Sequence, residues 1–65
     1  MTGNIYHIAY RTPHGVHLAR ISERTVGLAK RRLKANEPEA IEMQRVGALW
    51  IKQNLPGVGY KIDLT

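Results

Sequence analysis

A turn signal near the N-terminus, Thr-Pro-His-Gly at residues 12–15, constrains the fold more than any other feature of the sequence. It separates residues 4–11 from residues 16–21, two runs rich in the aromatic and β-branched residues that favour strands. Proline sets φ for the first position of a type I turn, and Gly15 can adopt the left-handed conformation that closes a three-residue loop. The sequence therefore predicts a β-hairpin whose loop is residues 13–15.

The predicted loop fixes which residues of the two strands face each other. Thr12 and Val16 would close it, so that Tyr10 faces Leu18 and the other pairs follow. One face of the hairpin then carries large side chains and is expected to be the core: Tyr6, Ile8, Tyr10, Val16 and Leu18. The other face is expected to be exposed and to contact a partner or a second copy of the chain through His7, His17, Ile5, Ala9, Ala19 and Ile21.

Two helices and a third strand are predicted after the hairpin. Ser22 can cap a helix, and apolar residues at helical spacing predict that helix over residues 23–35. Strong helix formers predict a second helix over about residues 38–53, with a strand over 46–52 as the alternative. Clean alternation of apolar and polar residues then predicts a half-buried strand over residues 58–64.

Together these elements predict an α+β fold in the order ββααβ. A three-stranded sheet, formed by the β-hairpin and the C-terminal strand, would be covered on one face by both helices in a second layer. With 65 residues we expect one small α+β domain over residues 1–65, and the lack of cysteine excludes disulfides and thiolate metal sites. A core this small favours extra stabilisation by a partner or by homodimer formation.

The hydropathy of the chain gives an expectation for its location. The N-terminus lacks a basic segment followed by an apolar one, which a secretory signal would need. The longest uninterrupted apolar run, Val46 to Ile51, is far too short to span a bilayer. We therefore expect a cytoplasmic protein that does not bind membranes.

The positive charge is concentrated in one part of the chain. The formal net charge is +5, but residues 11–35 hold seven Lys and Arg against one Glu, whereas the residues from 36 onward hold three against four acids. Local excess charge of this kind indicates a binding surface for an anionic partner. The candidate polyanion-binding or partner-binding residues are Arg24, Lys30, Arg31, Arg32 and Lys34 on the first predicted helix, with Arg11, Arg20 and Lys61 in support.

The first hypothesis is a small, basic, non-catalytic module that binds the phosphate backbone of nucleic acid through its cationic helix. The alternative is a protein-interaction or inhibitor module that docks on an acidic surface of a larger host protein. In size and simplicity the chain resembles the small α+β accessory proteins of phage and mobile elements, which fits that alternative. A third reading is a solvated helix end, because cations near a helix C-terminus complement its dipole and need no ligand.

The residues form no catalytic, metal-binding or cofactor-binding constellation, so we predict no enzyme activity, no cofactor, no metal and no small-molecule substrate. His14 lies at the predicted turn. His7 and His17 are about four residue rises apart in the predicted register, too far for two ligands of one metal ion. Ser22 is explained as a helix cap, and Trp50 is expected in the core or as a partly exposed interface anchor.

Overall fold

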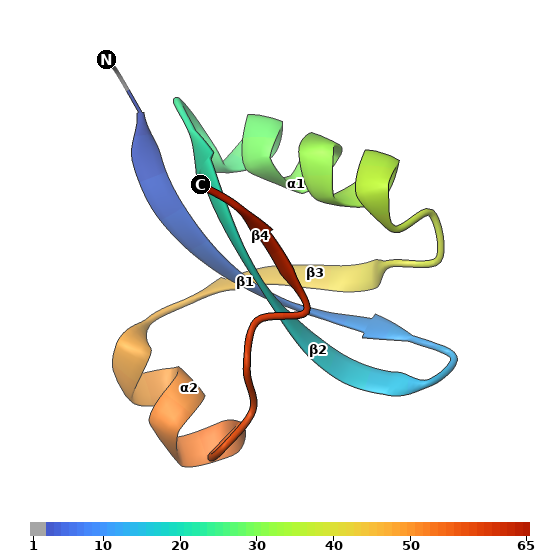
Figure 1. Cartoon of the computed structure of the whole chain (residues 1–65), viewed down its shortest axis with the longest axis vertical. Helices are drawn as coiled ribbons and strands as arrows, with labels where there is room; N and C mark the ends of the chain where they lie inside the picture. The colour runs from blue at the N-terminus through green and yellow to red at the C-terminus, as the bar shows by residue number, and fades with distance from the viewer. Residues whose placement is uncertain (1–2) are drawn as a thin grey trace.

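A computed structural model describes residues 3–65 as an α+β fold in the order ββαβαβ, with a four-stranded mixed sheet and two helices (Figure 1). The strand order is β3-β1-β2-β4; β1 is antiparallel to β2 and β3, and β4 is parallel to β2. The elements are β1 (Asn4–Thr12), β2 (Gly15–Glu23), α1 (Val26–Asn36), β3 (Ile41–Val46), α2 (Ala48–Asn54) and β4 (Ile62–Leu64). The α+β class is confirmed, but the predicted order and the number of strands are wrong.

The hairpin is confirmed, but its register differs from the predicted one by one residue. Thr12 pairs with Gly15, so the connecting turn consists of Pro13 and His14 alone. The backbone N–H of His14 donates to Thr12 Oγ1 at 3.1 Å, so this donor has a partner within the two-residue turn. Gly15 does adopt a positive φ, of 123°, but as the first residue of β2. Tyr10 therefore faces His17.

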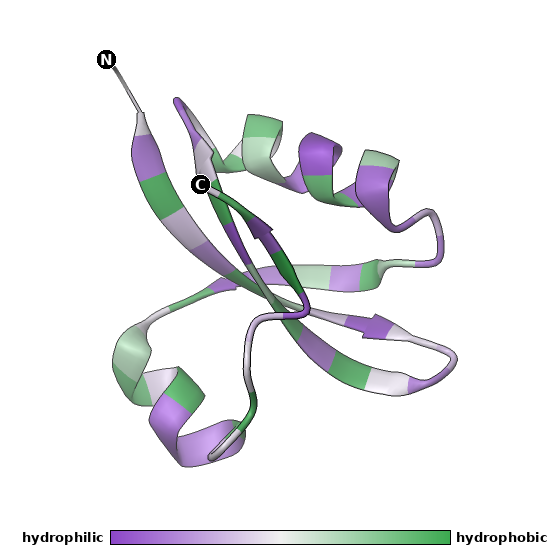
Figure 2. Ribbon diagram, viewed as in Figure 1, coloured by the Kyte–Doolittle hydropathy of each residue, from purple (hydrophilic) through white to green (hydrophobic). Residues whose placement is uncertain are grey.

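This shift changes which residues of β2 share a face with the core of β1. Ala19 and Ile21 pair with Ile8 and Tyr6 and are fully buried, so the prediction that they lie on an exposed face is wrong. Leu18, predicted on that core face, lies on the other side of the sheet. Apolar residues occur at both odd and even positions along β1 and β2, so alternation does not single out one core face. Figure 2 shows apolar segments along both strands.

The other residues of the predicted exposed face are also divided. Ala9 is buried, Ile5 is exposed, and His7 and His17 are half-buried on opposite faces of the sheet. Val16, predicted in the core, is 41% exposed. The expected continuous sheet surface does not form, because both faces of this sheet are partly covered.

Helix α1 covers one face and begins later than predicted. Ser22 belongs to β2, and Thr25 is the N-cap residue, accepting from the backbone N–H of Leu28 at 3.2 Å. Ala29 and Leu33 point into the sheet and are fully buried. They join the larger core cluster, which also contains Tyr6, Ile8, Tyr10, Ala19, Ile21 and Ala40.

The predicted second helix is wrong in its first half. Residues Ile41–Val46 form β3, because the open edge of β1 offers ladder hydrogen bonds that outweigh helix propensity. A β-bulge interrupts this ladder between Ala9 and Arg11, and Glu42 adopts a left-handed φ of 53° there. The helix proper is the short α2.

The second core lies on the face opposite α1, so the prediction that both helices cover one face of the sheet is wrong. Trp50 and Ile51 of α2, together with Leu55 and Tyr60, pack against Ala9, Leu18 and Val46. The final strand is shorter than the predicted 58–64, because pairing with β2 begins where the Lys61 N–H donates to Leu18 O at 2.8 Å. Neither helix within residues 3–65 is long and apolar enough to cross a membrane.

Candidate functional site

Half of the cations predicted to bind a partner form ion pairs within the protein. Arg11 contacts Glu42 at 3.1 Å and Arg32 contacts Glu23 at 3.2 Å. Two further pairs hold the C-terminal segment, Arg20 to Asp63 at 2.6 Å and Lys61 to Glu37 at 3.2 Å. Each of these cations has an acid beside it that a phosphate would have to displace.

Five cations outside these pairs lie on α1, just before it, or on the edge strand β3 (Figure 1). Within residues 3–65 none of them makes an ion pair. We call this set the α1 cation cluster: Arg24, Lys30, Arg31, Lys34 and Arg45. The only other charged side chains of the described chain without an ion pair are Lys52 and Glu39, which have opposite signs, so the cluster carries as much charge as the formal net +5.

Hydrogen bonds and one cation–aromatic contact lie at the two ends of the cluster. At one end, Tyr6 Oη donates to Arg24 O at 3.4 Å, and the Arg45 guanidinium lies over the Tyr6 ring, 5.0 Å from its centroid. At the other end, Lys34 Nζ donates to Ala40 O at 2.9 Å. Tyr6 thus lies between Arg24 and Arg45, and Lys34 reaches the residue that precedes β3.

The cluster is exposed enough to meet a ligand. Arg24, Arg31, Lys34 and Arg45 are exposed and Lys30 is half-buried. Lys34 also lies in the last turn of α1, where a cation is stabilised by the helix dipole. The dipole accounts for Lys34 alone, since the other four cations lie outside that turn.

Sequence reasoning missed Arg45. The segment around it contains strong helix formers, which predict a second helix separate from the cationic one. Only the long-range pairing of Ile8 with Arg45 between β1 and β3 brings this side chain to the α1 face. Nothing in the sequence of residues 41–46 predicts that pairing with β1.

The cations predicted to support binding are held by hydrogen bonds and ion pairs to other side chains of the protein. On the face opposite α1, Tyr60 Oη and His7 Nδ1 are 2.6 Å apart, and Arg20 lies over the Tyr60 ring at 4.9 Å. The hydrogen bond from Arg20 lowers the pKa of Asp63 to about 2. These contacts fix the last strand to the sheet and leave Arg20 committed to Asp63.

A second network surrounds Glu37, at the end of α1. Tyr10 Oη donates to Glu37 Oε2 at 2.7 Å, and Lys61 contacts the same oxygen. Burial and the adjacent carboxylate raise the pKa of Tyr10, while the hydrogen bonds from Tyr10 and Lys61 lower the pKa of Glu37. Lys61 thus fastens the C-terminal segment to this corner of the molecule.

The histidines do not form a group. His17 Nε2 lies 2.7 Å from Thr12 Oγ1, on the face opposite His7, and His14 is exposed in the turn. Within residues 3–65 no three His, Asp or Glu side chains gather in a way that could hold a metal ion. Comparison with protein-family models, with curated proteins and with solved structures finds no match to this chain.

Proposed function

We propose that this protein is a small non-catalytic module that binds the phosphate backbone of nucleic acid through the α1 cation cluster. The observation that carries the proposal is the distribution of charge. The ion pairs balance the charges over most of the sheet, and the excess positive charge remains along α1 and the edge strand β3. Lys and Arg side chains that neutralise phosphates release condensed counterions, which drives binding that does not depend on base sequence.

The structure leaves fewer cations available for phosphate contacts than the sequence predicts. Arg24, Lys30 and Arg31 are the cations of the cluster outside both the last helical turn and the aromatic contact with Tyr6. They can approach a phosphate without breaking an ion pair. Arg11, Arg20, Arg32 and Lys61 would each have to leave an acid, so they contribute to folding first.

The test compares two variants that lose the same charge. Binding of labelled duplex and single-stranded oligonucleotides is followed by fluorescence anisotropy at rising salt concentrations. Each phosphate contact contributes about 0.9 to the slope of log K against log salt on duplex DNA and about 0.7 on single strands. The cluster variant carries Arg24→Gln, Lys30→Gln and Arg31→Gln, and the control variant carries Arg20→Gln, Arg32→Gln and Lys61→Gln, three ion-paired cations outside the cluster.

We expect the cluster variant to bind weakly with a shallow salt dependence, and the control variant, where circular dichroism shows it folded, to keep most of the slope. Equal losses in both would mean that total charge, not this surface, governs binding. Absence of binding by the unaltered protein at ~50 mM salt would refute the proposal. A stoichiometric protein partner that survives nuclease treatment of a lysate would favour the alternative, docking on an acidic protein surface.

A further inference from the structure

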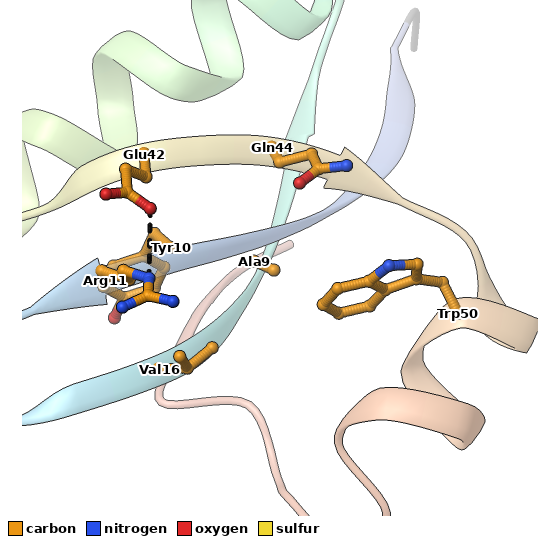
Figure 3. A pocket seen from close by; sticks show the side chains of 7 residues that line it. All are labelled: Ala9, Tyr10, Arg11, Val16, Glu42, Gln44 and Trp50. Carbon is orange, nitrogen blue, oxygen red and sulfur yellow. Dashed lines mark ion pairs between the residues drawn. The ribbon is translucent and has the colours of Figure 1, made fainter.

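A pocket opens on the face of the sheet opposite α1, between β1, β3 and α2 (Figure 3). It has a volume of about 190 Å³, below the range of about 300–1,000 Å³ that takes drug-sized ligands. Its size therefore suits one planar ring system. The lining residues are Ala9, Tyr10, Arg11, Val16, Glu42, Gln44 and Trp50.

The walls of the pocket differ in chemistry. Trp50 reaches from α2 toward Ala9 at one end, and the Arg11–Glu42 ion pair stands at the other (Figure 3). The small side chain of Ala9 leaves space between them, and Val16 supplies an apolar side wall. The pocket thus combines an aromatic surface with groups that can donate and accept hydrogen bonds.

The polar groups of the pocket can form hydrogen bonds with the edge of a nucleobase. The Gln44 amide extends from β3 beside the indole, and an amide both donates and accepts (Figure 3). A nucleobase likewise presents donors and acceptors along its edge and a flat face that stacks on aromatic side chains. An apolar side chain of a protein partner would use Trp50 and Val16 but leave this polar rim unused.

The pocket lies one edge strand away from the α1 cation cluster. Gln44 lines the pocket, while its neighbour Arg45 lies on the α1 face over Tyr6. No further strand pairs with β3 within residues 3–65, so a flexible chain can pass over that edge from one face to the other. A stiff duplex could not make this turn, because its bases stay stacked inside the helix.

We infer that the pocket holds one unpaired nucleobase of a bound single strand, stacked against Trp50 and contacted at its edge by Gln44. This inference rests on the proposed function, because the α1 cation cluster supplies the phosphate contacts that hold the strand. It adds a preference for single strands over duplex and for bases over a bare polyanion.

Trp50 is the only tryptophan in the chain, so tryptophan fluorescence reports on this one side chain, which lines the pocket. The protein is titrated with a short oligodeoxythymidylate and, separately, with linear polyphosphate, which carries the charge without bases. We expect the oligonucleotide to quench Trp50 and polyphosphate to bind without quenching. Polyphosphate binding, followed by displacement of a labelled oligonucleotide, reports on the α1 cation cluster independently.

Two variants test the contacts, with affinity read from a labelled oligonucleotide. Stacking of one base on an aromatic side chain sets the scale, so Trp50→Leu should weaken oligodeoxythymidylate binding at least about fivefold. Because Trp50 also packs in the second core, Gln44→Ala provides a change at an exposed position, and we expect it to weaken the oligonucleotide but not polyphosphate. Gln53→Ala, an exposed glutamine of α2 outside the pocket, is the matched control.

The outcomes separate the two proposals. Binding of both probes with no change in Trp50 emission, or equal affinities for Gln44→Ala and Gln53→Ala, would overturn the pocket inference and leave the α1 cation cluster standing. Binding of neither probe would overturn the proposed function and the pocket inference with it. Quenching by the oligonucleotide but not by polyphosphate, with weaker oligonucleotide binding in Gln44→Ala and unchanged binding in Gln53→Ala, supports both.

Discussion

Tyr10 Oη donates a 2.7 Å hydrogen bond to Glu37 Oε2, which joins a buried residue of the central strand β1 to the residue that follows α1. The same carboxylate oxygen lies 3.2 Å from Lys61 Nζ, in the segment leading to β4. Three parts of the chain that are distant in sequence therefore meet at one side chain. These contacts stabilise a domain with a small core, because they hold the end of α1 and the C-terminal segment against the sheet.

The first prediction concerns this hydrogen bond. Tyr10→Phe should lower the free energy of unfolding by about 1 kcal/mol, the usual net value of one hydrogen bond, since the ring still fills the core. Urea unfolding followed by circular dichroism measures the change. The double variant with Glu37→Ala should lose less than the two single variants combined, because both remove the same contact. Simple additivity would show that the two side chains act separately.

The second prediction is a dependence of stability on pH through Asp63. Arg20 lowers the pKa of Asp63 from its ordinary 3.8 to about 2, so the folded state binds its proton less readily than the unfolded state. The stabilisation is therefore complete above pH 3.8 and is lost as the pH falls toward about 2. Urea midpoints across this range should fall less steeply for Asp63→Asn than for the unaltered protein. Parallel curves would show that the ion pair does not couple folding to protonation.

The hairpin illustrates how far the sequence determines the fold. Its two strands and its turn position follow from residue types, and the structure confirms them. The register does not follow, because the three-residue loop predicted over residues 13–15 separates the hairpin into one core face and one exposed face, which this sheet does not have. Both faces are partly covered here, and Leu18 and Ala19, adjacent in sequence, are buried on opposite sides. An alternation argument fails when both parities are apolar.

The segment from Ile41 to Asn54 marks a second limit. Its composition favours a helix, but only α2 is helical, because β3 gains ladder hydrogen bonds to β1. The same limit applies to predicting which residues form the binding surface. The cations of α1 could be predicted from their spacing, whereas Arg45 and the ion pairs that occupy Arg11 and Arg20 depend on contacts between distant residues.

The third prediction concerns the strained residue beside the pocket. Glu42 has a φ of 53°, a conformation that costs an L residue about 1–2 kcal/mol and glycine little. Glu42→Gly and Glu42→Ala both lose the exposed contact with Arg11, so their difference isolates the backbone. Thermal unfolding should show Glu42→Gly to be more stable than Glu42→Ala by about 1 kcal/mol. Equal stabilities would mean that the β-bulge relaxes when the side chain is shortened.

The fourth prediction uses two adjacent arginines of α1. Arg32 Nη1 lies 3.2 Å from Glu23 Oε2 and donates to Ser22 O at 3.0 Å, whereas Arg31 is exposed and makes no ion pair within residues 3–65. Arg31→Gln should reduce the salt slope of duplex binding by about 0.9 and leave stability unchanged, because it removes one phosphate contact. Arg32→Gln removes the same charge but should chiefly lower the urea midpoint, because it frees Glu23 and Ser22 O. A larger loss of salt slope in Arg32→Gln than in Arg31→Gln would contradict the division between folding cations and binding cations.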